Sequence, residues 1–490
     1  MEVSVIVCVD KQGGISKNGV IPWKIKEDTQ FFVDVTRRRY NKHGKNGLLM
    51  GLKTWQSVQS STIIKDCVII VVSTTLLITE GTKGIYVAKS LLDAAVLASS
   101  LSLDHLFICG GKDIYEACFM HWHAMPIIIT RIDANYECDN RINIMQHVTL
   151  KKYQCDTSRS FMLMDTNNNK LVNVTFDRYY FKSKPHYWLS NPEERQYLSL
   201  LHDVLQNGDF RQTRNGMTWS MFGKTLTFDL QQGFPLFTSK KLFFRGIFEE
   251  LLFFLKGDTN ANHLTDKGVH IWDANTSREF LDSVGLQHYQ SGDIGPMYGY
   301  NLLHYGFPYE GMDQDYTNKG FNQIDYVLNL LKTDPFSRRI MMTTYDPSTA
   351  SQGCLYPCHG NMIQFYAKQK DDCYHLSCLM TQRSVDMICA SGFGISSYAL
   401  LIYLICEVIN NDKSYQGIKF KPGHLTVSWG DTHIYEDHRS ACIRQLLRDP
   451  YSFPQLKINR QVETLTDFKF EDFELVNYQC YPTIKVKMVA

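Results

Sequence analysis

The sequence lacks an excess of charge of either sign. Its 490 residues include 51 lysines and arginines and 50 aspartates and glutamates, which leaves a formal net charge of +1 at pH 7. This balance provides no global field that would attract a nucleic-acid backbone or an anionic membrane. Any anionic ligand must therefore be held by a few local groups, and RNA binding is not indicated.

Targeting segments and long hydrophobic runs are also missing. The opening residues MEVSVIVCVD have no basic region and too short an apolar run for a signal peptide. The longest apolar stretch, YALLIYLICEVI at 398–409, falls short of the roughly 20 residues that span a bilayer, which predicts a core helix and no membrane partner. We therefore expect a cytoplasmic protein whose fourteen cysteines are reduced thiols.

Two common ligand-binding signatures are absent as well. No C-x-x-C pair is present, and such a pair is the usual mark of a structural zinc site. The remaining candidate metal ligands are too loosely spaced to predict a metal site, and they are Cys354, Cys358, His359, Cys373 and Cys378. The chain also has no G-x-G-x-x-G motif, which disfavours an ordinary Rossmann domain.

The length and the hydrophobic pattern indicate two domains. Residues 1–182 alternate short apolar runs, such as VSVIVCV and DCVIIVV, with turns and helical patterns, which predicts an α/β domain with a central, mostly parallel sheet. An Asn-rich turn within 165–181 predicts a late hairpin. The two prolines of SKPHYWLSNP at 183–192 are typical of a short linker, and an α+β domain is expected over 193–490.

The segment GCLYPCHG at 353–360 contains a candidate nucleophile, Cys358. His359 and nearby arginines would supply a positive field that lowers the pKa of the thiol, although packing is the commoner role of a single cysteine. Arg383, followed by Ser384, places a guanidinium fork beside a hydroxyl, which suits phosphate oxygens. The other candidate phosphate ligands, for which solvated surface pairs are the alternative, are Arg214, Arg338 and Arg339.

Eight segments of the second half, in this order and spacing, resemble thymidylate synthase. They are EELLFFLKGDTN, IWDANTSREFLDS, GDIGPMYGYNLLHYG, DPFSRRI, PCHG, QRSVDM, GDTHIYEDH and PTIKVKM. The resemblance covers about residues 193–490 and implies that Cys358 attacks C6 of the uracil of dUMP. It further implies that Glu250 and Tyr298 order water and move protons, with His359 beside them, and that 5,10-methylenetetrahydrofolate is the co-substrate.

The same resemblance implies two sets of ligand-binding residues and a homodimer. Those that would bind dUMP are Arg214, Arg338, Arg339, Gln382, Arg383, Ser384, Asp386, Gly394, His433 and Tyr435. Those that would contact the folate are Ile271, Trp272, Asp386, Phe393 and Ala490. Arg338 and Arg339 would reach into the site of a partner subunit, and the C-terminal segment would close over the site.

One departure from the thymidylate synthase pattern concerns the base of the nucleotide. Where the family reads PFNIASY, this chain reads GFGISSY, which puts Gly394 at the position of the asparagine and Gly392 at that of the proline. A glycine offers no side chain to read O4 and N3 of uracil, so we expect a weakened preference for dUMP over dCMP. This leaves open a pyrimidine nucleotide methyl- or hydroxymethyltransferase with relaxed base choice.

The first half places Asp28 in an expected helix and two glycines between a strand and a helix, in FICGGKDIYEA. Alone, Asp28 would be read as a carboxylate favoured by the helix dipole. Together with LLMGLKTW, VVSTT and IITRID, these segments resemble dihydrofolate reductase across about residues 1–182. The resemblance implies that Asp28 binds the pterin and helps to deliver a proton, while NADPH supplies the hydride.

The residues that would contact the folate in this half are Val7, Asp28, Phe32 and Thr130. Those that would line the NADPH site are Cys8, Ile15, Gly19, Lys53, Thr54, Ser73, Lys89, Cys109, Gly110, Gly111 and Tyr115. Cys67 stands where the family has an arginine for the folate glutamate, with Lys65 as a possible substitute, and Leu52 replaces a basic residue near the NADPH phosphate.

The two resemblances together predict one bifunctional enzyme, fused as in protozoa, plants and some large viruses. The departures at Cys67 and Leu52 leave open a weak or inactive reductase half, retained for dimerisation or RNA binding.

Overall fold

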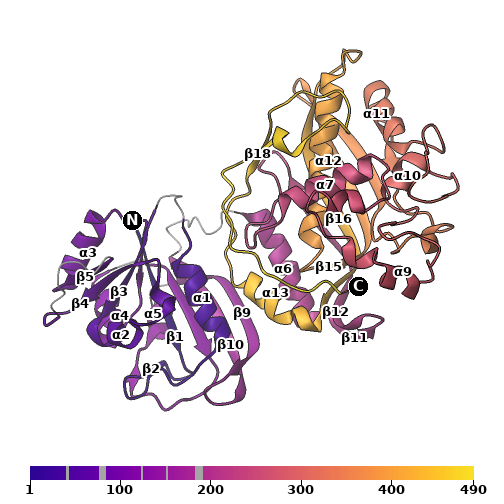
Figure 1. The fold of residues 1–490 in the computed structure, drawn as a ribbon. Coiled ribbons are helices and arrows are strands. Elements are labelled where there is room, and N and C mark those ends of the chain that lie inside the picture. The colour runs from indigo at the N-terminus through magenta and orange to yellow at the C-terminus, as the bar shows by residue number, and fades with distance from the viewer. Residues whose placement is uncertain (40–43, 77–83, 123–124, 151–152, 182–190, 490) are drawn as a thin grey trace. The chain divides into compact units, whose positions relative to one another are not determined.

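The computed structural model describes residues 1–39, 44–76, 84–122, 125–150, 153–181 and 191–489 (Figure 1). The chain divides into two compact units, Met1–Leu189 with Leu447–Asp449 and Ser190–Leu446 with Pro450–Ala490. Most of the linker expected at 183–192 falls outside the described residues. Helix α6 (Pro192–Asn207) follows it, with the side chain of Asn191 accepting a hydrogen bond from the backbone of Glu194.

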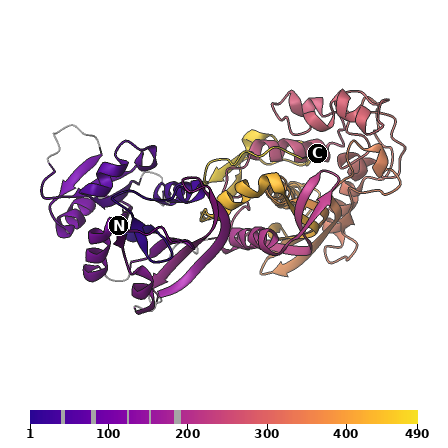
Figure 2. The same cartoon turned by 90° about the horizontal axis from the view of Figure 1, so that it is seen from below.

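An eight-stranded sheet forms the centre of the first unit, in the order β5-β4-β3-β6-β1-β7-β10-β9. The strands from β5 to β7 are parallel, and β10 and β9 run antiparallel as a long ribbon at one edge (Figure 2). The bounds are β1 (Glu2–Val9), β3 (Asn46–Gly51), β4 (Val68–Val72), β5 (Ile85–Ala88), β6 (His105–Ile108), β7 (Ile127–Ile132), β9 (Tyr153–Asp165) and β10 (Lys170–Phe181). The mostly parallel sheet and the hairpin across the Asn-rich turn are thereby confirmed.

The central strands are buried, which explains why they read as continuous apolar runs. Val5, Leu49, Ile108 and Ile129 belong to one hydrophobic core in this unit. The helices are α1 (Lys26–Thr36), α2 (Leu52–Val58), α3 (Leu91–Ser100), α4 (Lys112–His121) and α5 (Ile144–Leu150), with a 3-10 turn at Thr62–Ile64. A separate two-stranded pair joins β2 (Gly14–Ser16) to β8 (Asn140–Arg141).

A six-stranded mixed sheet carries the second unit, in the order β11-β12-β16-β15-β14-β13. The bounds are β11 (Asp209–Thr213), β12 (Gly216–Asp229), β13 (Met341–Met342), β14 (His359–Lys370), β15 (Cys373–Asp386) and β16 (Phe420–Tyr435). Val427, Met380 and Ile363 are register neighbours across β16, β15 and β14, and all three are buried. One face of the sheet is therefore the core face.

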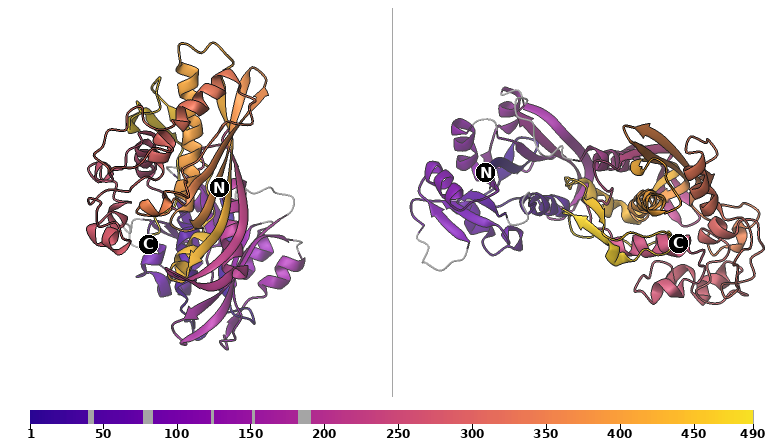
Figure 3. Two further views of the ribbon diagram at one scale, coloured as in Figure 1. Left: turned by 90° about the vertical axis from the view of Figure 1, so that its right-hand side faces the viewer. Right: turned by 90° about the horizontal axis from the view of Figure 1, so that it is seen from above.

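Helix α12 (Ser391–Asn411) packs along β15 and β16 (Figure 3). The core helix predicted at 398–409 is confirmed, but it begins earlier and is 21 residues long. The extension is possible because Gly392 lies against Leu242, where an added Cβ would come within 2.9 Å of a side-chain carbon. Among the described residues, α12 has the length and composition of a membrane span, yet 72% of its apolar window is buried in the fold. Burial of this extent is typical of a core helix.

The other helices of the second unit surround this core. They are α7 (Phe244–Leu255), α8 (Asn262–Thr265), α9 (Arg278–Ser283), α10 (Gly299–His304), α11 (Gln323–Thr333) and α13 (Arg439–Leu446), with 3-10 turns η3 (Asp273–Asn275), η4 (Ala350–Gln352), η5 (Glu436–His438) and η6 (Phe470–Asp472). A small sheet pairs β17 (Gln455–Ile458) with β18 (Phe473–Val476). Helix α7 packs on α12 and α10, which brings Glu250 and Tyr298 toward the same interior region.

Candidate active sites

Cys358 lies immediately before β14, with its sulfur 3.4 Å from the hydroxyl oxygen of Tyr298. The same hydroxyl accepts a hydrogen bond of 3.1 Å from the backbone N–H of Cys358. Because the oxygen accepts from that N–H, its own proton is free to point to the sulfur. Tyr298 is thus placed to donate to a thiolate.

The loop that carries Cys358 is braced by Arg383 on β15. The guanidinium donates to the carbonyl oxygens of Pro357 (3.0 Å) and Tyr356 (2.8 Å). The backbone N–H of Arg383 bonds to the carbonyl of Cys358 and to the side chain of Asn361. Asn361, which sequence reasoning missed, lies at a bulge just after His359. Arg383 therefore positions the thiol as well as adding charge beside it.

The pKa of the Cys358 thiol reflects opposing effects. Burial is the largest of them and raises the pKa, while the Tyr298 hydrogen bond and the charge of Arg383 lower it, and Glu250 raises it. The net direction is upward, so the expectation of a lowered thiol pKa is wrong. The surroundings of Cys358 thus favour the thiol over the thiolate.

His359 is not a source of positive charge. Its Nδ1 lies 2.9 Å from the hydroxyl of Tyr398, and burial lowers the pKa of its imidazole to about 4. The ring is consequently neutral at pH 7, which corrects the prediction that it strengthens the positive field. The sequence interpretation missed Tyr398. The one feature of the sequence that could have indicated it is its position four residues after Gly394, on the same face of the helix.

Glu250 projects from α7 and accepts a hydrogen bond of 2.9 Å from the indole N–H of Trp272. Burial raises the pKa of Glu250 to about 7, and the Trp272 bond opposes this by favouring the carboxylate. A carboxyl group that titrates near neutrality suits a proton-transfer role. Trp272 belongs to the predicted folate set, and the structure shows that it also holds Glu250.

A proton-accepting role for Glu250 predicts that turnover rises with pH through about 7. Replacing Trp272 with phenylalanine removes the bond that stabilises the carboxylate, so the rising limb should move to higher pH. The pH dependence of kcat for dTMP formation checks this. A limb at unchanged pH in the Trp272→Phe variant would show that another group titrates.

The register of the sheet gathers several of the predicted nucleotide ligands. Gln382, Ser384 and Asp386 alternate along β15 and so face the same side. Asp386 pairs with His433 of β16, and Gln382 pairs with His359 of β14. The Nε2 of Gln382 donates to the carbonyl of Ser384, which fixes the amide. The sequence spacing does not by itself predict that these residues of β14, β15 and β16 lie together, because their proximity depends on how the strands pair.

Other predicted nucleotide ligands lie toward the surface. Arg214, in the turn between β11 and β12, has an exposed side chain whose charge acts on Tyr435. Arg338 and Arg339, in the loop before β13, also have exposed side chains. Of the predicted folate contacts, Ile271 and Phe393 are half-buried and Trp272 is buried, while Ala490 lies outside the described residues.

In the first unit, Asp28 lies in the first turn of α1. Burial raises the pKa of its carboxyl group, and hydrogen bonds from Thr130 and Cys8 lower it. Cys8 and Thr130 are register partners on β1 and β7, which explains why both reach one carboxylate. The Asp28 link to Thr130 is as predicted, and Cys8, which we expect to line the NADPH site, also contacts Asp28.

The Gly110–Gly111 segment suits the close approach of a diphosphate. Gly110 has a φ of +97°, and an added Cβ there would lie 2.6 Å from the ring of Tyr115. Gly111 caps α4 without any side-chain hydrogen bond, which leaves the first N–H groups of the helix for an anion. The hydroxyl of Tyr115, a predicted NADPH residue whose ring lies next to Gly110, donates to the carbonyl of Ile6 and is thereby held in place. The glycines and the helix N-terminus are suited to hold the diphosphate of NADPH.

The remaining predicted ligands of this unit are distributed between surface and interior. Lys53, Lys89 and Gly19 are exposed, Thr54, Ile15, Cys109 and Phe32 are half-buried, and Val7 and Ser73 are buried. The Ser73 hydroxyl oxygen accepts hydrogen bonds from the backbone of Thr75 and Leu76. Exposed lysines beside a buried serine are compatible with a phosphate held at the surface.

The environment of Cys67 contains basic residues that the sequence interpretation missed. The charges of Arg37 and Arg39 both act on the Cys67 thiol, and the Arg37 guanidinium donates to the carbonyl of Thr62 at 2.6 Å. Lys65, which was expected to substitute for the missing arginine, is exposed. Arg37 and Arg39, whose charges act on Cys67, are therefore better candidates than Lys65 for the missing basic group, although the motif spacing indicates neither of them.

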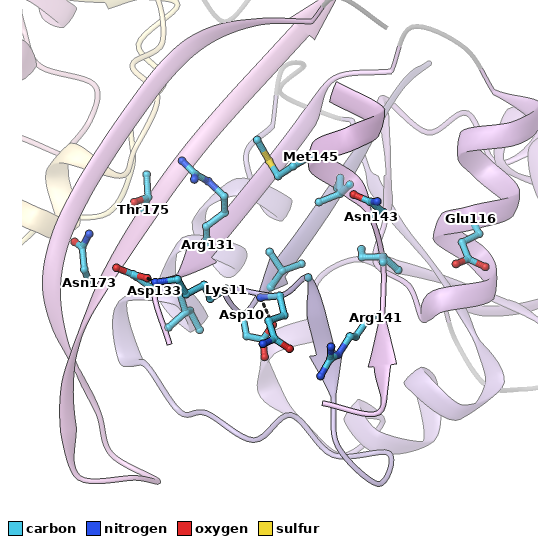
Figure 4. Close-up of a pocket in the computed structure, with 16 residues that line it drawn as sticks. Asp10, Lys11, Glu116, Arg131, Asp133, Arg141, Asn143, Met145, Asn173 and Thr175 are labelled. Atoms are coloured by element: carbon cyan, nitrogen blue, oxygen red, sulfur yellow. Dashed lines mark hydrogen bonds and ion pairs between the residues drawn. The ribbon is translucent and has the colours of Figure 1, made fainter. Parts of the chain in front are cut away.

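Figure 4 shows the residues that line a polar hollow in the first unit. They include Asp10, Arg131 and Arg141, and an ion pair of 2.9 Å joins two others, Lys11 and Asp133. None of its lining residues is among the predicted folate or NADPH ligands. Acidic and basic groups both line this hollow, so its charges favour neither an anionic nor a cationic ligand.

Comparisons with known proteins match each half of the chain to a different family. The dihydrofolate reductase family model matches residues 2–179, and the thymidylate synthase family model matches residues 195–490. The chain is 34% identical over 521 residues to a bifunctional dihydrofolate reductase-thymidylate synthase of Zea mays, covering 99% of this chain and 96% of that protein. It is 35% identical over 488 residues to the protein of that name in Paramecium tetraurelia, covering 99% and 98%.

Proposed function

This chain belongs to the bifunctional dihydrofolate reductase-thymidylate synthase family, and we propose which of its residues act in each of the two reactions. The enzyme methylates dUMP to dTMP with 5,10-methylenetetrahydrofolate and reduces the resulting dihydrofolate with NADPH. The residue roles below are our proposal, and the contacts of Cys358, Tyr298 and Glu250 are its main support.

In the synthase reaction, the sulfur of Cys358 adds to C6 of the uracil ring. C5 then carries the negative charge of an enolate and attacks the methylene carbon of the folate. Tyr298 donates to the sulfur while it is a thiolate, and Arg383 keeps the Cys358 loop in place. Glu250, whose pKa lies near 7, accepts the proton released from C5. The bond from the one-carbon unit to the folate nitrogen then breaks, the folate transfers a hydride to that carbon, and the sulfur leaves C6, which yields dTMP and dihydrofolate.

Nucleotide binding is assigned to groups on neighbouring strands. Ser384, Arg383 and Arg214 would hold the phosphate, and His433 and Tyr435 the deoxyribose hydroxyl. His433 is oriented by Asp431, whose carboxylate lies 3.0 Å from its Nδ1. Ile271, Trp272 and Phe393 would pack on the folate. A phosphate would also draw the Arg383 guanidinium from its backbone carbonyls, which makes Arg383 a link between binding and the Cys358 loop.

In the reductase reaction, Asp28 binds the pterin ring, and NADPH supplies the hydride when it is bound. Gly110, Gly111 and the first turn of α4 would hold its diphosphate, and Lys53, Ser73 and Lys89 its 2′-phosphate. Phe32 would pack on the pterin. Burial raises the pKa of Asp28, which favours its protonated form, and we assign that proton to the substrate.

A homodimer through the second unit completes the proposal. Phe336 and Met341 lie on either side of Arg338 and Arg339 in the sequence, and Tyr366 lies on β14, the strand that pairs with Met341. All three side chains are exposed although they are large and apolar, which is typical of residues in a protein interface. The occupant that fits is a second copy of this chain, whose site would receive Arg338 and Arg339.

The shared site is tested by mixing two inactive variants. Cys358→Ser and the double variant Arg338→Ala/Arg339→Ala should each fail to make dTMP. Random exchange of subunits should restore about a quarter of the wild-type activity, because half of the dimers then contain one intact site. Activity that stays absent after exchange, confirmed by mixed dimers on native mass spectrometry, would contradict a shared site.

Gly394 provides a test of base selection. An added Cβ at Gly394 would meet only the Oε1 of Gln382, at 3.7 Å, which is an ordinary van der Waals contact. We expect Gly394→Asn to raise the ratio of kcat/KM for dUMP to that for dCMP by about tenfold, because an amide reads O4 and N3. Gly394→Ala, which adds no polar group, is the matched control. Equal ratios in all three proteins would mean that Gln382 or water already reads the base.

The cytosol is the compartment that we propose. Its support is that all fourteen cysteines are free thiols in the described structure, as a reducing compartment maintains them.

A further inference from the structure

Three potential metal ligands converge beside the predicted folate site of the second unit. They are Asp386 at the end of β15, Cys389 in the turn that follows, and His438 at the end of η5, here called the Asp386 cluster. One carboxylate oxygen, the sulfur and one ring nitrogen all lie within 4.8 Å of one another. No member but Asp386 belongs to the predicted ligand sets, and none was among the metal ligands considered from sequence.

One ring nitrogen of His438, a residue that is only 3% exposed, faces this cluster. This Nδ1 forms an ion pair with a carboxylate oxygen of Asp386 at 3.4 Å, which is long for a hydrogen bond. Buried polar atoms normally have a closer partner, which this contact within the cluster does not provide.

The other side of the same ring fixes its tautomer. The Nε2 of His438 lies 2.8 Å from the carbonyl oxygen of Lys487, to which it can only donate. In the neutral ring the lone pair is consequently on Nδ1, toward the cluster. Metal-binding histidines commonly give one ring N–H to a carbonyl in this way, so that the other nitrogen faces the metal.

Asp386 is held in a matching way. Its Oδ1 accepts hydrogen bonds from the backbone N–H groups of Ile388 (3.0 Å) and Cys389 (3.1 Å). These two bonds orient the carboxylate so that Oδ2 points to His438. An oxygen, a nitrogen and a sulfur donor are thereby presented to one point by groups whose backbone is fixed.

We propose that the Asp386 cluster binds a single divalent cation of the zinc class, with one coordination position left open. Zinc accepts sulfur, imidazole nitrogen and carboxylate oxygen together in four-coordinate sites, and three protein ligands with a fourth exchangeable one is a common arrangement. The Cys389 thiol would release its proton when the metal binds, so that a thiolate and a carboxylate then contribute two negative charges. The buried Lys240, whose Nζ donates to the carbonyl of Ile388, adds a positive charge nearby and makes the site weaker than a cysteine-rich one.

Occupation of this site would inhibit the synthase. The metal would take the Asp386 carboxylate from the folate, and through His438 it would fix Lys487 in the C-terminal segment. This predicted inhibition rests on the proposed roles of Asp386 and of the C-terminal segment. Metal binding does not depend on those roles, so binding and inhibition are tested by separate measurements.

Binding is tested with Co²⁺ as the spectroscopic probe and Zn²⁺ as its competitor, on the full-length protein. One equivalent of Co²⁺ should give a sulfur-to-cobalt charge-transfer band and visible bands of four-coordinate cobalt, and Zn²⁺ should remove both. Cys389→Ser should weaken Co²⁺ binding by at least about tenfold and abolish the charge-transfer band. Cys358→Ser, which removes a different thiol, should leave both unchanged.

The outcomes are decisive in both directions. Equal Co²⁺ affinity and an unchanged charge-transfer band in Cys389→Ser would overturn the metal site, and so would their loss in Cys358→Ser alone. Retained reductase turnover and an unchanged melting temperature establish that Cys389→Ser is folded. Zn²⁺ should inhibit dTMP formation at least about tenfold more strongly in wild type than in Cys389→Ser. A wild-type protein that makes no dTMP would refute the proposed synthase roles while the cobalt spectrum still judges the site.

Discussion

Replacing Cys358 with serine is expected to abolish dTMP formation, with a loss of roughly 10³-fold or more in kcat. The serine hydroxyl is a far weaker nucleophile than a thiolate, and the polar contacts of this site stabilise negative charge on sulfur. Tyr298 donates to the sulfur, and the charge of Arg383 lowers the pKa of the thiol. Release of dTMP from dUMP, followed by chromatography, measures the loss.

The Cys358→Ser variant carries its own control, because the reductase residues belong to the other unit. Its oxidation of NADPH with added dihydrofolate should match that of wild type. A second control is Cys354→Ser, since Cys354 is buried among apolar residues of the adjacent core and should affect stability more than chemistry. Substantial dTMP formation by Cys358→Ser would remove Cys358 from the mechanism.

Replacing Asp28 with asparagine is expected to lower reductase turnover at pH 7 by about 10²–10³-fold, the usual contribution of a general acid. Burial raises the pKa of Asp28 in the folded protein, so the protonated carboxyl persists to a higher pH than in a free side chain. Wild-type turnover should consequently fall as the pH rises through that raised pKa. The asparagine variant has no such proton, and its turnover should lose this limb.

Stopped-flow measurement of hydride transfer across pH 5–9 separates these effects from product release. The synthase activity of Asp28→Asn should be unchanged, which establishes that the chain is folded. Reductase turnover that keeps both its rate and its falling limb in Asp28→Asn would assign the proton to another donor.

Much of the fold could be predicted from sequence because local patterns carry it. The uninterrupted apolar runs around Val5 and Leu49 indicated strands buried on both faces, and the glycines of the FICGG segment marked the passage from β6 to α4. The length of α12 could not be predicted in this way. Its first turn contains glycine and serine, which are poor helix formers, and Gly392 in that turn lies close to Leu242 and Phe237, two residues far away in the sequence.

The site was predictable as a set of residues, but its electrostatics was not. The resemblance to thymidylate synthase identified Cys358, Glu250 and Tyr298, and the structure adds why their chemistry differs from that of free side chains. The neutral state of His359 and the pKa of Glu250 near 7 follow from burial, which depends on packing between segments far apart in sequence. The same limit applies to Tyr398 and to the Asp386 cluster, whose members span residues 386–438.

The most direct test of the central claim, that one chain makes dTMP and restores its own folate, starts without any dihydrofolate. Purified protein is given dUMP, 5,10-methylenetetrahydrofolate and NADPH, and dTMP and NADPH are measured together. Wild type should oxidise one NADPH for each dTMP formed. Cys358→Ser should do neither, and Asp28→Asn should form dTMP while NADPH persists. NADPH oxidation by Cys358→Ser at the wild-type rate, or dTMP formation by wild type with no NADPH consumed, would contradict the account.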